Sequence, residues 1–133
     1  MIMREVKTQF INPDTVCPPG GHYSHGVCAN GMLFISGQLP ITADGHKMAG
    51  DSFEHQAQQV MRNITHILLA SGSSVDRIVQ VRVYLTDLEH WPLFNRLYQA
   101  WLGDVRPARC VVPVPALHYG FAIEMEAVAL VDA

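Results

Sequence analysis

The stretch Phe121-Ala-Ile-Glu-Met-Glu-Ala-Val-Ala-Leu-Val131 decides the fold expected for this chain of 133 residues. Successive residues of a β-strand point to opposite faces of the sheet, so the stretch sorts into two sets. One face is apolar and consists of Phe121, Ile123, Met125 and Ala127. The other face carries Ala122, Glu124, Glu126 and Val128. The pattern predicts a strand that packs one face against helices and carries two carboxylates on the other.

Two amphipathic helices are predicted upstream of this strand. From Ser52 to Ala70 apolar residues recur every three or four positions, with Asp51 or Ser52 as the cap and Gly72 as the stop. A second helix begins near Pro92, because proline is favoured in the first helical turn. Its apolar stripe consists of Leu93, Phe94, Leu97, Tyr98, Trp101 and Leu102. Each helix therefore has one face suited to covering a sheet.

Five further strands complete the expected order βββαβαββ, at residues 7–11, 24–29, 32–36, 78–86 and 108–114. The Asn30-Gly31 pair joins the second strand to the third and is a favoured signal for a tight antiparallel hairpin. Arg109 in the penultimate strand shares its face with Val111, whereas Cys110 points the other way. If the last two strands also form a hairpin, Arg109 lies near Glu124.

These elements predict a single α+β domain over residues 1–133. Two helices cover only one face of such a sheet, yet residues 32–35 and 128–131 are apolar at consecutive positions, which point to both faces. The second face therefore needs a partner. Association of identical chains, sheet against sheet, into a closed oligomer is the simplest solution.

Composition argues against several classes of protein. Nine basic and twelve acidic residues give a formal net charge of −3, and no run of Lys or Arg supplies the basic stripe that binds phosphate backbones. No apolar stretch approaches the roughly 18 residues of a membrane span, and the start lacks the order of a secretory signal. The odd set of Cys17, Cys28 and Cys110 fits reduced thiols. We therefore expect a cytoplasmic protein that binds neither nucleic acid nor membranes.

A metal site is not expected either. Cys17, His22, His25 and Cys28 have a spacing loosely like that of a zinc site. Strand alternation, however, separates His25 from His22 and Cys28. No metal or other cofactor is part of the expected chemistry.

Arg109 and Glu124 are the residues best suited to chemistry. The planar guanidinium of an arginine binds a carboxylate through two parallel hydrogen bonds, and a nearby carboxylate can position and deprotonate water. Together they suit the hydrolysis of a small acid. From spacing alone, solvated charges or a structural ion pair explain both residues at least as well.

Four segments in a fixed order resemble the signature blocks of the Rid (reactive intermediate deaminase) or YjgF family, formerly described as endoribonuclease L-PSP. They are GHYSHG (21–26), FISGQLP (34–40), PAR (107–109) and AIEMEA (122–127). The resemblance spans nearly the whole chain. It implies a chorismate-mutase-like α+β fold with two helices on one face of the sheet. It also implies a homotrimer with a substrate cleft at each subunit interface and no cofactor.

The resemblance also implies roles for individual residues. Arg109 resembles the carboxylate clamp, Glu124 the water-activating residue, and Tyr23, Ser36 and Asn95 the polar groups that shape the pocket. Without the family, these last three are an ordinary strand aromatic, a turn residue and a solvent-facing helix residue. Composite clefts are then expected to set Arg109 and Glu124 of one subunit against Tyr23 of its neighbour.

The chain also departs from the family pattern at two places. Val111 stands where many active members carry a cysteine, so a thiol role is excluded there, but the backbone carbonyl offered by that position is retained. Cys110 projects from the opposite face and is no substitute. The stretch Leu117-His-Tyr-Gly120 lacks the proline that often follows the leucine. The second departure lies at the expected pocket rim.

The expected function is hydrolytic deamination of reactive 2-imino or 2-enamino acids, such as 2-aminoacrylate or 2-iminopropionate, to 2-oxo acids and ammonia. Two alternatives stay open. One is a pathway-specific deaminase of a larger enamine acid such as an aminomuconate, which the altered rim permits. The other is a non-catalytic protein that binds or senses a 2-oxo acid in the same cleft.

Overall fold

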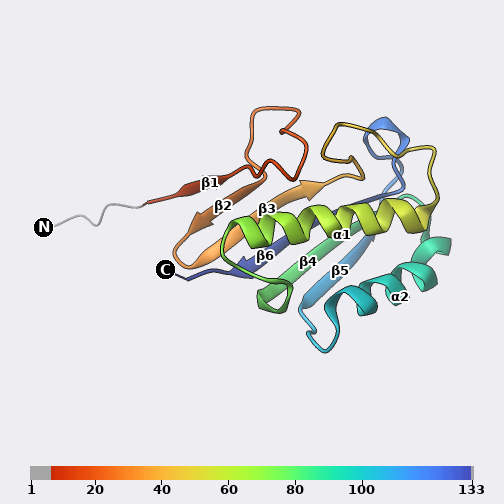
Figure 1. Ribbon diagram of the computed structural model, residues 1–133. Helices are drawn as coiled ribbons and strands as arrows, with labels where there is room; N and C mark the ends of the chain where they lie inside the picture. The colour runs from red at the N-terminus through yellow and green to blue at the C-terminus, as the bar shows by residue number, and fades with distance from the viewer. Residues whose placement is uncertain (1–6, 133) are drawn as a thin grey trace, which may run out of the picture.

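The computed structural model describes residues 7–132, which form one mixed six-stranded sheet and two helices (Figure 1). In chain order the elements are β1 (Gln9–Ile11), β2 (Gly26–Ala29), β3 (Met32–Gln38), α1 (Phe53–Ala70), β4 (Ile78–Leu85), α2 (Trp91–Leu102), β5 (Ala108–Pro113) and β6 (Ile123–Leu130). Short 3₁₀ turns lie at Val75–Arg77, Leu88–His90 and His118–Gly120. The predicted order βββαβαββ and the α+β class are confirmed.

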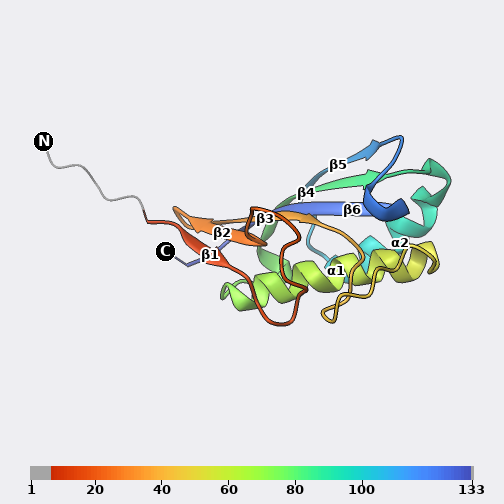
Figure 2. The ribbon, with the colours of Figure 1, turned by 90° about the horizontal axis from the view of Figure 1, so that it is seen from above.

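Both helices cover the same face of the sheet, as expected (Figure 2). α1 begins where the sequence predicted, because the Ser52 hydroxyl caps it by accepting a hydrogen bond from the amide of His55 at 3.2 Å. The core lies between this face and the helices, and its fully buried side chains include Leu33, Val60, Ile64, Ile67, Val81, Val83, Phe94, Ile123 and Met125. The apolar side of β6 is therefore the floor of the core.

The predicted β2–β3 hairpin is confirmed. Asn30 and Gly31 have φ values of 52° and 74°, and the strands pair antiparallel from Gly26 opposite Ile35 to Ala29 opposite Met32. Two adjacent residues with positive φ match the twist of the flanking strands, which explains the Asn-Gly pair.

The expected hairpin of the last two strands is wrong. The sheet order is β1-β2-β3-β6-β4-β5, so β6 lies between β3 and β4 and pairs antiparallel with both. β5 instead pairs parallel with β4 at the edge of the sheet. The physical reason is α2, because a helix between two strands provides the long crossover that parallel neighbours require.

The face away from the helices carries a continuous apolar row. Phe10 pairs with Val27, Val27 with Phe34, and Phe34 with Val128, so these side chains lie side by side across four strands. Phe10 is 69% exposed and Phe34 is 49% exposed. Residues 7–132 leave this row uncovered, as the alternation of apolar residues predicted for the second face.

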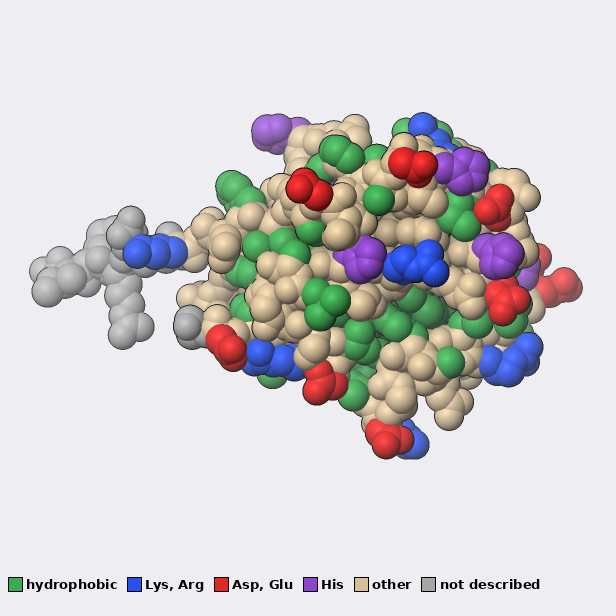
Figure 3. Space-filling view, viewed as in Figure 1, with side chains coloured by type: hydrophobic (Ala, Val, Ile, Leu, Met, Phe, Trp, Pro, Cys, Tyr) green, Lys and Arg blue, Asp and Glu red, His purple; other side chains and the backbone are tan. Residues whose placement is uncertain are grey.

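The surface on the helix side carries basic, acidic and histidine side chains that are scattered rather than gathered by sign (Figure 3). The cysteines at positions 17, 28 and 110 are all free thiols. Across residues 7–132, no helix has both the length and the apolar character needed to cross a membrane.

Candidate active site

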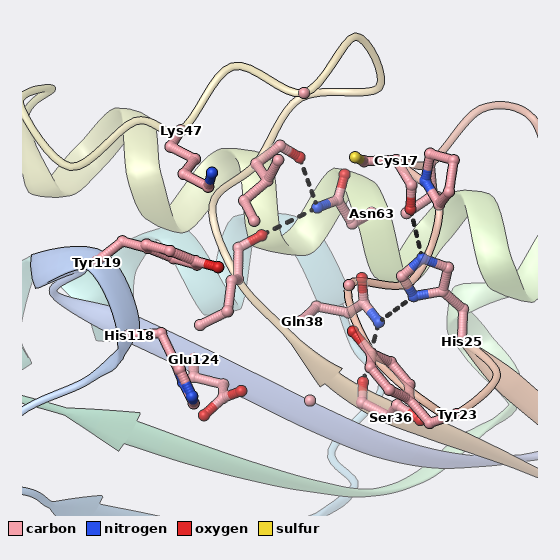
Figure 4. A pocket seen from close by; sticks show the side chains of 17 residues that line it. Cys17, Tyr23, His25, Ser36, Gln38, Lys47, Asn63, His118, Tyr119 and Glu124 are labelled. Atoms are coloured by element: carbon pink, nitrogen blue, oxygen red, sulfur yellow. Dashed lines mark hydrogen bonds between the residues drawn. The ribbon is translucent and has the colours of Figure 1, made fainter.

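A cavity of about 590 Å³ opens at the end of the sheet where β3 ends and β6 begins (Figure 4). Its walls come from the loop before β2, the end of β3 with the loop that follows it, and the 3₁₀ turn before β6. Its polar lining consists of Cys17, Tyr23, His25, Ser36, Gln38, Lys47, Asn63, His118, Tyr119 and Glu124. A cavity of this size, lined mainly by apolar surface with a few convergent polar groups, is typical of a small-molecule site.

Glu124 supplies the carboxylate of this cavity and is only partly exposed. Burial raises its pKa above the ordinary value of 4.5, the nearby His118 charge opposes that rise, and Glu126 adds to it. The carboxylate lies directly against Gly37, since a Cβ placed there would come within 2.6 Å of Oε2 of Glu124. Glycine at position 37 therefore makes room for the carboxylate, and the raised pKa suits a group that exchanges protons with a substrate.

Ser36 and Tyr23 lie in the same cavity as Glu124. The Ser36 hydroxyl donates its proton to the carbonyl of Ser24 at 2.7 Å, so toward a ligand its oxygen can only accept hydrogen bonds. The Tyr23 ring stands edge-on to His25, with centroids 6.0 Å apart, and is 49% exposed. These residues form a wall that can accept hydrogen bonds from a ligand and pack against it.

A buried hydrogen-bonded chain holds this wall in place. Nε2 of His25 lies 2.6 Å from the Cys17 carbonyl, while its Nδ1 lies 3.1 Å from the Gln38 amide nitrogen. Gln38 also donates to the Ser36 carbonyl at 3.0 Å. Since the carbonyl can only accept, Nε2 carries the proton and Nδ1 accepts. Both ring nitrogens of His25 are thus occupied by structural hydrogen bonds.

Arg109 lies elsewhere, on the helix-covered face at the edge strand β5. Its guanidinium sits over the rings of Trp91 and Tyr98, with centroids 4.9 and 4.8 Å away, and 6.0 Å from that of Phe94. Nη1 donates to Oδ1 of Asn95 at 2.9 Å. We call these five residues the aromatic box. Stacking on ring faces leaves the edge of the guanidinium as the part that can bind a carboxylate.

The structure thus divides the six predicted site residues into two groups. Tyr23, Ser36 and Glu124 line the cavity, whereas Arg109 and Asn95 belong to the aromatic box, and Val111 packs against the core on the same side as Arg109. The expectation that Arg109 lies near Glu124 is wrong within one chain. Arg109 pairs with Val81, which also pairs with Ala127 on the apolar, helix-covered face of β6. Glu124 lies an odd number of residues from Ala127 on the same strand, so it points to the opposite face of the sheet.

Glu126 shares the strand face of Glu124 but has a different environment. The Tyr84 hydroxyl donates to Oε1 of Glu126 at 2.5 Å, and this hydrogen bond is the main cause that raises the pKa of Tyr84 to about 12. Glu126 does not line the Glu124 cavity. The Glu126 carboxylate is thus hydrogen-bonded to Tyr84, whereas the Glu124 carboxylate faces the cavity.

Sequence reasoning missed Gly37, Lys47, His118 and Tyr119 as cavity residues. Lys47 gave no local signal, because it lies in a loop whose position depends on α1. The turn containing His118 and Tyr119 did give a signal in the sequence, because the chain departs from the family pattern there.

The fold and the cavity define a class of small α+β proteins that have a cavity with a few convergent polar groups at one end of a sheet covered by two helices. Residues 15–131 match the family model described as endoribonuclease L-PSP. The chain therefore belongs to this family, which takes in proteins named Rid, YjgF and RutC, and the resemblance inferred from the motifs is confirmed.

Individual relatives share both sequence and structure with the chain. Protein HMF1 of Saccharomyces cerevisiae is 43% identical over 107 residues, which cover 80% of this chain and 82% of HMF1. The crystal structure of RidA from the Antarctic bacterium Psychrobacter is 34% identical, with a TM-score of 0.88, over 92% of this chain and 99% of that one. E. coli TdcF, solved with bound serine, is 28% identical with a TM-score of 0.87, over 93% and 99% of the two chains. The likeness therefore covers the whole architecture.

Proposed function

We propose that this protein hydrolyses reactive 2-imino or 2-enamino acids to 2-oxo acids and ammonia, without a cofactor. The observation that carries the proposal is Glu124, a half-buried carboxylate with a raised pKa that faces a small-molecule cavity beside Ser36 and Tyr23. Membership of a family that includes RidA proteins supports the same chemistry. The bound serine in TdcF supports a ligand of amino-acid size.

In the proposed mechanism Glu124 accepts a proton from water as the water oxygen adds to the imine carbon. Glu124 returns this proton to the nitrogen, which completes the carbinolamine. It then takes the hydroxyl proton of the carbinolamine and passes it to the nitrogen as the C–N bond breaks, so that ammonia leaves and the C–O bond becomes the carbonyl of the 2-oxo acid. Ser36, whose own proton is committed to Ser24, accepts a hydrogen bond from the imine nitrogen or the water. Each turnover consumes one water and leaves Glu124 as it began.

Arg109 holds the substrate carboxylate in this mechanism, and it comes from a neighbouring subunit. Arg109 and Glu124 point to opposite faces of one sheet, so one chain cannot present both to a small acid. A homotrimer that covers the apolar row of Phe10, Phe34 and Val128 would bring the aromatic box of one subunit to the cavity of the next. The cleft is therefore composite, but Glu124 and Tyr23 share a subunit and Arg109 comes from the other. This grouping replaces the one expected from the sequence.

A larger substrate is the second candidate, because a cavity of about 590 Å³ exceeds what a three-carbon acid fills. The family description names an endoribonuclease, yet the net charge of −3 and the scattered charges on the helix-side face do not favour a nucleic-acid ligand (Figure 3). The free cysteines are consistent with the reducing cytoplasm, the location we propose.

The experiment that tests the proposal generates 2-iminobutyrate or 2-iminopropionate with a dehydratase and follows the appearance of the 2-oxo acid with and without the protein. Acceleration that depends on protein concentration is expected. Tight binding of the 2-oxo acid with no acceleration would instead identify a sensor, and the deaminase proposal would be wrong.

A further inference from the structure

Lys47 brings a positive charge to the wall of the cavity that faces Tyr23 and Ser36. Its Nζ lies 4.4 Å from the centroid of the Tyr119 ring, and both side chains point into the cavity (Figure 4). Within residues 7–132, no carboxylate lies within ion-pair distance of Lys47. An ammonium group that faces a cavity without a counter-ion attracts an anionic ligand group.

The loop that carries Lys47 is an ordered hairpin rather than a loose segment. Ile41 and Lys47 form an antiparallel bridge, and the amide of Thr42 donates to the His46 carbonyl at 3.0 Å. From α1, the buried Asn63 amide donates to two carbonyl oxygens at the base of the hairpin, each at 3.1 Å. Lys47 is thus held at the cavity before any ligand arrives, which lowers the entropic cost of using it.

The backbone of Tyr119 has a conformation that few residues other than glycine adopt. Its φ and ψ are 58° and 15°, in the left-handed region, and Gly120 follows with a φ of 77°. The ring is 62% exposed and stands 5.7 Å from the buried Phe121 ring. Backbone strain at a residue that is not glycine is concentrated at ligand sites, where the surrounding structure holds it. The strained turn points the Tyr119 hydroxyl into the cavity beneath Lys47.

From this placement we infer that Lys47 and Tyr119 form a second anion-binding subsite, so that the preferred substrate is a 2-imino or 2-enamino acid with a second carboxylate on its side chain. The inference rests on the proposed function. Arg109 of the neighbouring subunit takes the carboxylate next to the imine, Glu124 serves the imine carbon, and Lys47 takes the distal carboxylate. The Tyr119 hydroxyl donates a further hydrogen bond to it. The volume of about 590 Å³ leaves room for the longer side chain.

The test compares two imines of equal length that differ in the distal charge. An amino-acid oxidase produces 2-iminoglutarate from glutamate and the corresponding carboxamide imine from glutamine, and kcat/KM is measured for both. We expect the wild type to prefer the dicarboxylate, and Lys47→Met to lower the ratio of the two kcat/KM values about tenfold, the usual effect of losing one charge-assisted hydrogen bond. Lys47→Arg should keep most of the preference. Lys7→Met, which removes the other lysine of the chain at an exposed position, should leave it unchanged.

Two outcomes would overturn the inference while leaving the deaminase proposal intact. An equal loss for both imines in Lys47→Met would assign Lys47 to the carboxylate that both share. Unchanged kcat/KM values for both imines would show that Lys47 does not contact the ligand. If neither imine is hydrolysed faster than in buffer, the deaminase proposal fails. The subsite is then decided by calorimetric binding of 2-oxoglutarate against 2-oxoglutaramate. A preference for 2-oxoglutarate that Lys47→Met abolishes supports the subsite, and equal affinities in the wild type refute it.

Discussion

The Glu124 cavity and the aromatic box of Arg109 are built in opposite ways. Glu124 stands against the backbone of Gly37, in a hollow enclosed by hydrogen-bonded loops, and its charge is disfavoured by burial. Arg109 lies on an edge strand, where ring faces and the Asn95 amide support its charge. In the proposed chemistry the first region supplies the proton acceptor and the second the anion clamp, and neither is sufficient alone. That chemistry therefore requires two subunits to meet at the cavity.

The largest expected effect separates Glu124 from its neighbour on the same strand face. Glu124→Gln keeps the size of the side chain but cannot accept a proton, so kcat should fall by about a hundredfold or more. Glu126→Gln, the matched control, alters a carboxylate that is bound to Tyr84 and should cost severalfold at most. Steady-state rates of 2-oxo acid formation measure both. The reverse ranking would show that we have chosen the wrong carboxylate.

Mixing two inactive variants tests whether the two regions come from different subunits. Arg109→Ala and Glu124→Gln trimers, refolded together at equal ratio, should recover about a quarter of wild-type activity, because each half of a cleft is unmutated in half of the chains. Tyr23→Ala with Glu124→Gln should recover nothing, since both changes fall in the same cavity. Native mass spectrometry confirms that mixed trimers have formed. Recovery by the second pair and not by the first would contradict the grouping.

Arg109→Lys tests whether the aromatic box supplies shape or only charge. An ammonium keeps the positive charge but loses the flat, two-pronged grip, so kcat/KM should fall roughly tenfold to a hundredfold. The loss should appear mainly in KM if the clamp holds the substrate as firmly before the reaction as during it. Full activity in this variant would remove Arg109 from the site.

Gly37→Ala tests the contact that places the base. The new methyl group would lie 2.6 Å from Oε2 of Glu124, and the end of that flexible side chain can move away at little cost to folding. We expect kcat to fall about tenfold from the misplaced carboxylate, with the melting temperature nearly unchanged. A large loss of stability at full residual activity would mean that Gly37 serves the fold rather than the base.

The smallest expected effect is on stability. Because burial raises the pKa of Glu124 above 4.5, the folded state loses stability as pH rises from that value through the folded pKa. Glutamine carries no charge and is free of this loss. Urea titrations should give Glu124→Gln a higher free energy of unfolding than the wild type at about pH 8, and a smaller advantage at about pH 4. An advantage that does not vary with pH would be due to packing instead.

Most of the secondary structure followed from local patterns. Three local patterns indicate which side chains point to the core. They are the period of two in β6, the three- and four-residue spacing in α1, and the Asn30-Gly31 turn. The need for a covered second face followed from the same alternation. The family motifs added the identities of Glu124, Ser36 and Tyr23, which the structure brings into one cavity.

Contacts between residues far apart in the sequence could not be predicted in this way. Strand order depends on which edge a crossover helix reaches, so no local pattern showed that β6 separates β3 from β4 or that Arg109 faces α2. Two contacts in the cavity join segments that are distant in the sequence and meet only in the folded sheet. These contacts are Glu124 with Gly37 and Lys47 with Tyr119. Local spacing was enough to predict which elements form and which of their faces are apolar, because both depend on neighbours a few residues away. Which side chains share a cavity could be read only from the folded chain, because that depends on strand order and loop packing among segments far apart in the sequence.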